Sequence, residues 1–206
     1  MKRFTREEKE RISAAIHAAE SGTSGQFVAV VAHASEHYLF APLLWSAILA
    51  LLLPGGIAAL SGVSSFQDLY QLQLGVFVIL GALFLLVPGL HLRLIPRAIK
   101  HHRASRLAHA QFYDQGIHRT RDHSGVLFFV SMAERYVEIV ADQGIHEQIG
   151  ETRWQQIIEL FLSHVRNNEI VEGFVQAIHA CGEAMKEHYP SDPQAANELS
   201  DGLVEI

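Results

Sequence analysis

The sequence is short of cysteine, of charge and of basic residues, and each shortage excludes a class of protein. Cys181 is the single cysteine among 206 residues, which excludes a disulfide framework and a metal site made of several cysteines. Only 18% of the residues are charged, against roughly 25% in a typical soluble domain. The net charge of -6 excludes a strongly basic nucleic-acid binder, and 49% hydrophobic residues exclude a disordered chain. We therefore expect a folded, apolar-rich protein with no nucleic-acid partner.

The apolar excess is concentrated in residues 39–95. Within it, residues 43–60 (LLWSAILALLLPGGIAAL) and residues 72–90 (LQLGVFVILGALFLLVPGL) contain no charged side chain. About 18 residues at 1.5 Å each cover about 27 Å, close to the roughly 30 Å hydrocarbon core of a bilayer. The two runs are therefore predicted to form a transmembrane helical hairpin. The alternative, a buried hairpin of a soluble protein, would give so short a chain a very large core.

The flanks of the two runs differ in charge, and this difference predicts an orientation. The segment around the end of the second run carries basic and no acidic residues, namely Arg93, Arg97, Lys100, Arg103 and Arg106. The connecting loop carries Asp68 and no basic residue. Short segments rich in Lys and Arg stay in the cytoplasm, so we expect two spans with both termini cytoplasmic. A basic flank beside a span also predicts attraction to lipid headgroups, which makes the lipid bilayer a predicted partner.

The segment before the hairpin, residues 1–38, predicts one helix and one strand. Thr5 and Glu8 have the spacing of a capping box ahead of an amphipathic helix. Residues 26–32 (QFVAVVA) are apolar on both faces, which is typical of a central, covered strand. A segment of fewer than about 40 residues is rarely large enough to form a hydrophobic core of its own. This segment is therefore predicted to complete a domain with the chain that follows the hairpin.

The segment after the hairpin, residues 96–190, predicts the rest of that domain. A helix is expected from Pro96 to about Ile117. Residues 125–131 (GVLFFVS) and 135–141 (RYVEIVA) are typical of strands, the second with one wetter face. The fold class predicted is α/β, a small mixed sheet sandwiched by helices.

Two more helices and an acidic tail end the chain. Thr152 is predicted to cap the first helix, which carries Trp154 on its apolar side, and the second helix is expected over about residues 169–188. Residues 191–206 carry acidic and no basic residues. We expect them to form a solvated or loosely ordered end.

These soluble segments resemble the TPM domain, a family named after thylakoid-lumen, photosystem-repair and acetylcholine-receptor-modulator members. The resemblance is carried by Asp122, the strand that starts at Gly125, the Glu134-Arg135 turn, the Asp142-Gln-Gly144-Ile loop and Trp154. It covers about residues 4–31 and 97–190, with the hairpin as an insertion. The resemblance implies a compact α/β/α sandwich. It also implies acid phosphatase activity or divalent-cation binding for some members, and membrane-protein assembly for others.

Asp122 and Asp142 are the candidate metal ligands. Asp122 precedes one strand of the predicted hairpin and Asp142 follows the other, so the two carboxylates are expected at the same end of the sheet. Paired carboxylates bind a cation such as Ca²⁺ or Mg²⁺, or share a proton. His146 stands where many family members carry a carboxylate, and an imidazole weakens a cage that needs six to eight oxygens. The other interpretation, that both acids cap turns or helices, stays open.

The remaining polar residues give no complete catalytic motif. The 13 histidines show no pair arranged for a metal on one helix face, and the chain has no phosphate-binding glycine loop. Glu134 and Arg135 are predicted to be solvated turn residues. Cys181 is predicted to be a buried small hydrophobe rather than a nucleophile.

Two functions follow from these expectations. The first is a membrane-tethered accessory or scaffold at the inner membrane, whose cytoplasmic TPM-like domain binds a membrane protein complex or forms a homo-oligomer. The alternative is a divalent-cation-dependent acid phosphatase-like hydrolase that uses Asp122 and Asp142, with Ca²⁺ or Mg²⁺ as its cofactor. The first is favoured because the sequence supports the tether and contains no complete catalytic constellation.

Overall fold

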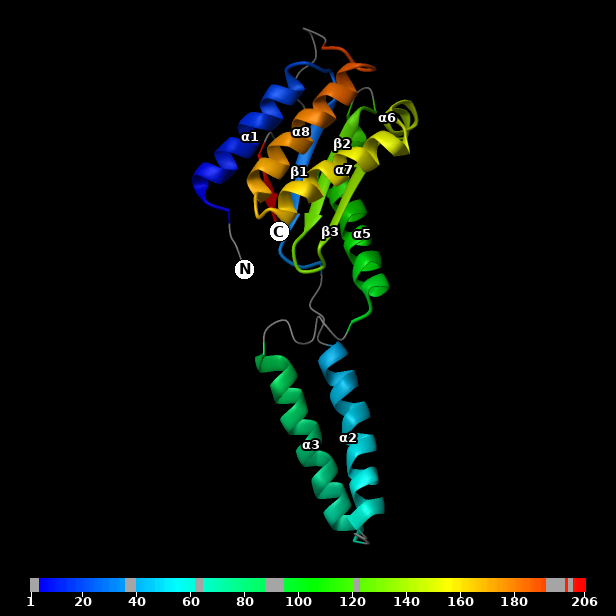
Figure 1. Ribbon diagram of the computed structural model, residues 1–206. Helices are drawn as coiled ribbons and strands as arrows, with labels where there is room; N and C mark the ends of the chain where they lie inside the picture. The colour runs from blue at the N-terminus through cyan, green and yellow to red at the C-terminus, as the bar shows by residue number, and fades with distance from the viewer. Residues whose placement is uncertain are drawn as a thin grey trace. The chain divides into compact units, whose positions relative to one another are not determined.

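The computed structural model separates into two compact units. One unit is Met1–Ser35 together with His101–Ile206, and the other is Glu36–Lys100. The structure describes residues 4–35, 40–61, 65–87, 95–120, 123–191, 199 and 202–206. Figure 1 shows the elements of both units, and each unit is treated by itself.

The larger unit is built on a mixed sheet with the strand order β3-β2-β1-β4. β1 (Gln26–Ala32) pairs in parallel with β2 (Gly125–Ser131), and β2 pairs antiparallel with β3 (Tyr136–Ala141). β1 and β2 are buried at every position, as their uninterrupted apolar sequences predict. β3 is half-buried along its whole length, as expected for a strand at the edge of a sheet.

The fourth strand comes from the C-terminal end of the chain. β4 (Val204–Glu205) pairs in parallel with β1 and places Val204 opposite Val30. The N–H of Ile206 donates to the Val31 carbonyl over 3.0 Å, and the N–H of His33 donates to the Ile206 carbonyl over 2.8 Å. The expectation of a solvated tail is therefore wrong for its last residues. They satisfy backbone groups that β1 would otherwise leave open at its edge. Residues 192–198, 200 and 201 of that tail lie outside the described residues.

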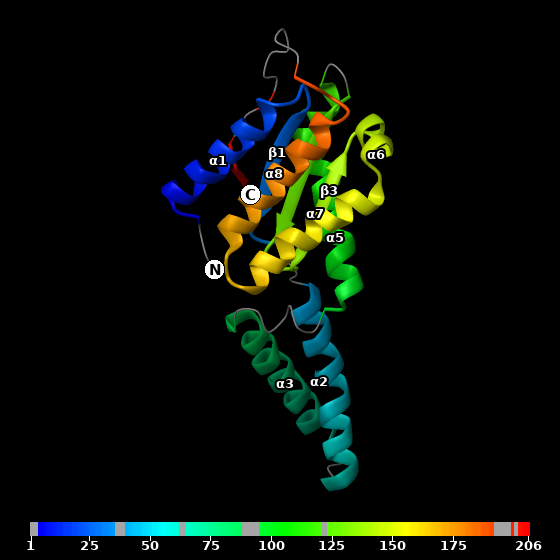
Figure 2. The same ribbon diagram turned by 45° about the horizontal axis from the view of Figure 1, so that its top comes forward.

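Helices cover both faces of the sheet, which confirms the predicted α/β fold (Figures 1 and 2). α1 (Arg6–Glu20), α7 (Glu151–Arg166) and α8 (Ile170–Lys186) lie on one face, and α5 (Arg97–Asp114) lies on the other. Side chains alternate between these two cores along each strand. The core under α1, α7 and α8 includes Phe27, Ala29, Val31, Phe128, Phe161 and Phe174. The core under α5 includes Val28, Val30, Ala104, Ala108, Leu127 and Phe129.

α1 begins and packs as the sequence predicts. The Thr5 side chain accepts from the N–H of Glu8 over 3.2 Å and the Glu8 carboxylate accepts from the N–H of Thr5 over 2.8 Å, a complete capping box. α1 and α8 approach closely where α8 has no side chain. A Cβ at Gly182 would lie 2.8 Å from the Cβ of Ala19, so this helix pair requires glycine at that position.

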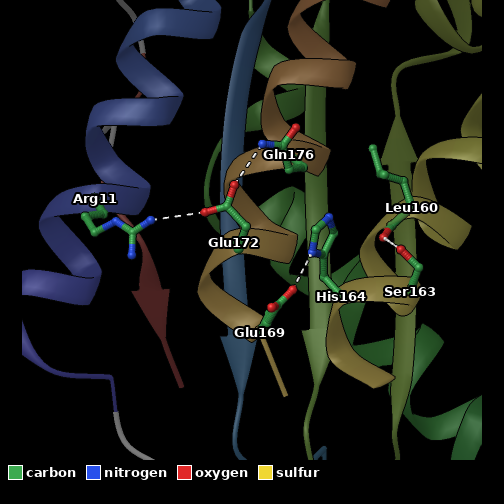
Figure 3. A network of polar contacts seen from close by, with 7 residues as sticks. All are labelled: Arg11, Leu160, Ser163, His164, Glu169, Glu172 and Gln176. Carbon is green, nitrogen blue, oxygen red and sulfur yellow. Dashed lines mark hydrogen bonds and ion pairs between the residues drawn. The ribbon is translucent and has the colours of Figure 1, made fainter. Parts of the chain in front are cut away.

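Polar contacts join the same helices at their surface (Figure 3). Arg11 of α1 donates to Glu172 of α8 over 3.1 Å, and Gln176 donates to the same carboxylate over 2.8 Å. The hydrogen bond from Gln176, followed by the charge of Arg11, holds the pKa of Glu172 below its usual range. At the turn between α7 and α8, His164 Nδ1 lies 3.1 Å from Glu169 Oε2.

Three expectations about the helices are wrong, and glycines with positive φ lie at the helix ends concerned. The helix expected to reach Ile117 ends at Asp114, since Gly116 has φ +73° and begins the 3-10 helix η1 (Ile117–Arg119). The loop expected after β3 is the short helix α6 (Gln143–Ile149), which ends at Gly150 with φ +78°. Gly150 also occupies the N-cap position of α7. Thr152 therefore lies inside α7 and does not cap it.

The smaller unit consists of two apolar helices, α2 (Phe40–Ser61) and α3 (Phe66–Leu86). By length and composition both are able to cross a membrane. α3 begins six residues before the predicted start of the second span, and residues 88–90 of that span lie outside the described residues. α2 continues through Pro54.

Most of the large apolar side chains of this unit are exposed, as in Leu60 (92%) and Phe66 (90%). The helices pack against each other where side chains are small, because a Cβ at Gly81 would lie 3.9 Å from the hydroxyl of the buried Ser46. Close contact through small residues is typical of helices in membranes. The exposure does not fit the alternative of a hairpin buried in the core of this chain.

Candidate functional site

The β2–β3 hairpin brings Asp142 to the start of β2. Val126 lies opposite Ala141, and the N–H of Asp142 donates to the Gly125 carbonyl over 3.0 Å. The residues just after β3 and just before β2 therefore meet at one end of the sheet. Asp122 lies outside the described residues, so its approach to Asp142 stays a prediction.

The Asp142 carboxylate lies in a poorly solvated position. Its side chain is 16% exposed, and the buried Oδ2 has no hydrogen-bond partner among the described residues. Burial raises the pKa of Asp142, while the charges of His123 and His118 oppose this rise. His123 Nδ1 lies 4.0 Å from Oδ2, too far for a hydrogen bond. Asp142 occupies the N-cap position of α6 but makes no side-chain cap bond, so helix capping does not explain this carboxylate.

The neighbours of Asp142 do not complete a cation cage in the described part of the chain. His146 Nε2 lies 3.7 Å from Glu151 Oε2, which places its nearest acidic partner on α7. Ser124 is buried, and its carbonyl accepts from the N–H of Gln26. Among the described residues no group of three or more His, Cys, Asp or Glu side chains is arranged to hold a metal ion. Within the described residues Asp142 is therefore an isolated, poorly solvated carboxylate, which can hold a cation only together with further ligands.

A polar cluster that the sequence does not reveal lies at the opposite end of the β2–β3 hairpin. Glu134, expected to be solvated, is 3% exposed. Its carboxylate accepts from the N–H of Ser35 over 3.0 Å and from the hydroxyl of Ser131. The hydroxyls of Ser35 and Ser131 lie 3.0 Å apart. The cluster fixes the turn to the point where the chain leaves β1.

The prediction for Cys181 is confirmed. The side chain is fully buried in the core between the sheet and α8, and burial raises the pKa of its thiol. A protonated thiol without solvent access is a poor nucleophile. Cys181 therefore belongs to the core rather than to a reactive site.

Comparison with known proteins assigns the larger unit. The family model for the TPM domain matches residues 94–184. This chain contains a TPM domain. The matched residues include α5, β2, β3, α6 and α7 completely. α1 and β1 precede the matched segment and lie in the same compact unit, with β1 between β2 and β4.

A solved structure has a similar overall fold. The NMR structure of the BA42 protein from the psychrophilic bacterium Bizionia argentinensis is similar, with a TM-score of 0.62 and 17% sequence identity. The alignment covers 100% of this chain and 97% of that chain. At this identity the likeness shows the fold alone. No curated protein matches this chain.

Proposed function

We propose that this protein is a membrane-tethered accessory or scaffold, whose TPM domain is held at the cytoplasmic face of the inner membrane by the α2–α3 hairpin. There it binds a membrane protein complex or copies of itself. The exposed apolar surface of the hairpin carries the proposal. Keeping apolar surface in water costs about 25 cal/mol per Å², and a bilayer removes this cost.

The charges beside the hairpin support the proposed orientation. Arg97, Lys100, Arg103 and Arg106 lie along α5, which follows the hairpin, whereas Asp68 is the charged residue of α3. Basic residues next to a span favour the cytoplasmic side. The TPM domain then shares the cytoplasm with both ends of the chain.

The phosphatase alternative has no complete catalytic or metal-binding group in its favour within the described residues. Its proposed ligands for Ca²⁺ or Mg²⁺ are Asp122 and Asp142, and it is supported by the poorly solvated Asp142 carboxylate alone. An aryl phosphatase activity that requires added Mg²⁺ or Ca²⁺ and is lost in Asp142→Asn would favour a hydrolase over an accessory.

Cysteine labelling in intact cells tests the orientation. Ser65→Cys, before α3, should react with a membrane-impermeant maleimide from outside. Ala110→Cys, exposed on α5, should react only after the membrane is opened. The wild-type chain is the control, because Cys181 is fully buried and should stay unlabelled. Labelling of Ala110→Cys in intact cells would contradict the cytoplasmic assignment.

Purification in a mild detergent tests the accessory role. The tagged full chain should run above the size of a monomer, with a membrane complex or with its own copies. A matched chain limited to the hairpin, residues 36–100, should not retain that association. A full chain that runs as a monomer without companions would contradict the accessory role, while leaving the membrane tether in place.

A further inference from the structure

The outer edge of β3 has no strand beside it among the described residues, because β3 ends the sheet. The N–H of Asp142 donates to the Gly125 carbonyl, and backbone groups alternate in direction along a strand. Val137, Ile139 and Ala141 therefore direct their N–H and C=O groups away from β2. β3 (YVEIVA) contains no Pro and no Lys, two residues that commonly block pairing at an edge, and its one charged residue, Glu138, is hydrogen-bonded to Ser105 of α5. The edge is ready to accept another strand.

A groove of about 610 Å³ runs along this edge. It is lined by all of β3, by Trp154 and Ile158 of α7, and by His109 of α5. Beside the groove, the Glu138 carboxylate accepts from the Ser105 hydroxyl of α5 over 3.2 Å, which holds this side chain against the face of the sheet. The outward-facing backbone groups of β3 and the groove next to them together form a surface that a strand of another chain fits.

The two ends of β3 carry opposite charges. Arg135, just before the strand, is exposed and has no acidic partner among the described residues. Its φ of +52° lies in the left-handed region, where glycine is less strained, so an arginine is kept there at some cost. Asp142, just after the strand, has the unpartnered Oδ2 described above. When a strand pairs antiparallel with a copy of itself, the start of each copy meets the end of the other.

We propose that two copies of this chain pair antiparallel through β3, so that their two sheets become continuous. The two-fold axis passes beside Ile139, which lies opposite Ile139 of the second copy, and Val137 lies opposite Ala141. This register uses all the outward-facing backbone groups. Glu138 lies opposite Val140, so no like charges face each other, a pairing that would destabilise a sheet.

The charges at the two ends of β3 favour a second copy of this chain over an unrelated segment as the partner of the strand. In this register the Arg135 end of β3 in each copy lies beside the Asp142 end of β3 in the other. Opposite rather than like charges therefore meet at both ends of the paired strands. The inference deepens the proposed function, because it names the surface through which the TPM domain binds a copy of itself.

Disulfide trapping of the full chain in its native membranes tests the register. In a hydrogen-bonded antiparallel pair the Cα atoms are about 5.5 Å apart, within the range of about 4.4–6.8 Å that a disulfide spans. Ile139→Cys should therefore form covalent dimers under mild oxidation. Val137→Cys is the matched control on the same strand. It lies four positions from its counterpart, roughly 13 Å, and should give few dimers.

The outcomes of this trapping separate the possibilities. No dimer from Ile139→Cys, or equal dimer from both variants, would overturn the proposed pairing. If a short bismaleimide instead links Ile139→Cys to a species of another size, the partner of β3 is a strand of another protein and the second copy is ruled out. A chain that stays in the membrane without forming dimers would overturn this inference and leave the tether intact.

Charge reversal tests the strand ends by rescue. Arg135→Glu or Asp142→Arg alone should weaken the dimer of the full chain about tenfold in a mild detergent, because each brings like charges together at both strand ends. The double variant should restore most of the wild-type dimer. Single variants without effect, or a double variant weaker than either single one, would contradict the pairing of Arg135 with Asp142.

Discussion

The two units of this chain use the same apolar residue types in opposite ways. In the TPM domain, large side chains such as Phe128 and Phe174 are fully buried between the sheet and its helices. In the α2–α3 unit, Leu51, Leu60 and Phe66 are exposed. The low overall charge of the sequence is therefore mainly a property of the α2–α3 segment. The domain buries its apolar side chains and exposes polar ones, whereas the hairpin exposes apolar side chains.

The comparison is tested most strongly by truncating one apolar side chain in each unit. Phe128 packs edge-to-face on Phe161 and Phe174 with ring centroids 5.2 and 5.7 Å apart. Phe128→Ala should therefore lower the free energy of unfolding of the TPM domain by about 3–5 kcal/mol. Leu51→Ala, in α2, should leave it unchanged. Denaturant unfolding of the detergent-solubilised chain checks this, and equal losses would erase the distinction between the units.

A charge at the middle of α2 tests the other side of the comparison. Leu52→Arg should make insertion of the span less favourable by about 2.5–3.5 kcal/mol, the cost of an arginine at the centre of a membrane helix. Leu52→Val is the control of similar shape without charge. The inserted fraction in a translocon insertion assay measures the effect. Equal insertion of both variants would show that α2 does not lie in a membrane.

The third prediction concerns adjacent residues in the β2–β3 turn. Glu134→Ala should destabilise the TPM domain by about 1–3 kcal/mol, because the part-buried Ser35 N–H and the buried Ser131 hydroxyl lose their acceptor. Arg135→Gly should hold or raise stability, because glycine adopts the positive φ with less strain. Thermal unfolding of both variants gives the comparison. A harmless Glu134→Ala would mean that the cluster does not fix the turn.

Much of the TPM domain could be predicted because its strands are short, continuous apolar runs. The apolar runs QFVAVVA and GVLFFVS coincide with β1 and β2. A strand that is buried on both faces is apolar at every position, so such a run marks it without an alternation of apolar and polar residues. The capping box at Thr5 likewise marks the start of α1 from local spacing alone. These features depend on neighbours in the sequence, so the sequence reveals them.

The features that were missed depend on distant partners or on backbone geometry. β4 has two residues, too few for any periodicity, and exists because β1 needs a partner at its edge. Glu134 is held in a buried position by the N–H of Ser35, a residue that lies 99 positions earlier in the sequence, before the α2–α3 hairpin. α6 was expected to be a loop because Gly144 lies within it. For the candidate site, the sequence predicted the end of the sheet where Asp142 lies. It did not predict that Asp142 Oδ2 is buried without a hydrogen-bond partner among the described residues.

A smaller effect is expected at the surface of the helix layer. Arg11→Ala should cost about 0.2–1 kcal/mol, because its contact with Glu172 is an exposed ion pair. Added salt should reduce the difference between variant and wild type. Acid should also reduce it, because the lowered pKa of Glu172 means that its contribution is lost as pH falls through that pKa. A loss that is independent of salt would point to packing rather than charge.

The smallest effect is expected at Asp142, where the test is whether its replacement raises or lowers the free energy of unfolding. Its raised pKa means that the folded domain binds this proton more tightly than the unfolded chain, so the charged carboxylate lowers stability above the folded pKa. Asp142→Asn should therefore hold or raise stability at neutral pH and match wild type at low pH. Any stabilisation of the wild type by Ca²⁺ or Mg²⁺ should vanish in the variant. A clear loss of stability at neutral pH would indicate a structural role for this carboxylate.

Alkaline carbonate extraction of cell membranes tests the central claim most directly, because it releases peripheral proteins and retains inserted ones. The account predicts that the full chain stays in the membrane pellet. It also predicts that a chain in which Ser35 is joined to Arg97 by a short flexible linker appears in the soluble fraction as a cooperatively folded TPM domain. A full chain released by carbonate would contradict the membrane hairpin, and so would a linked chain that remains in the pellet.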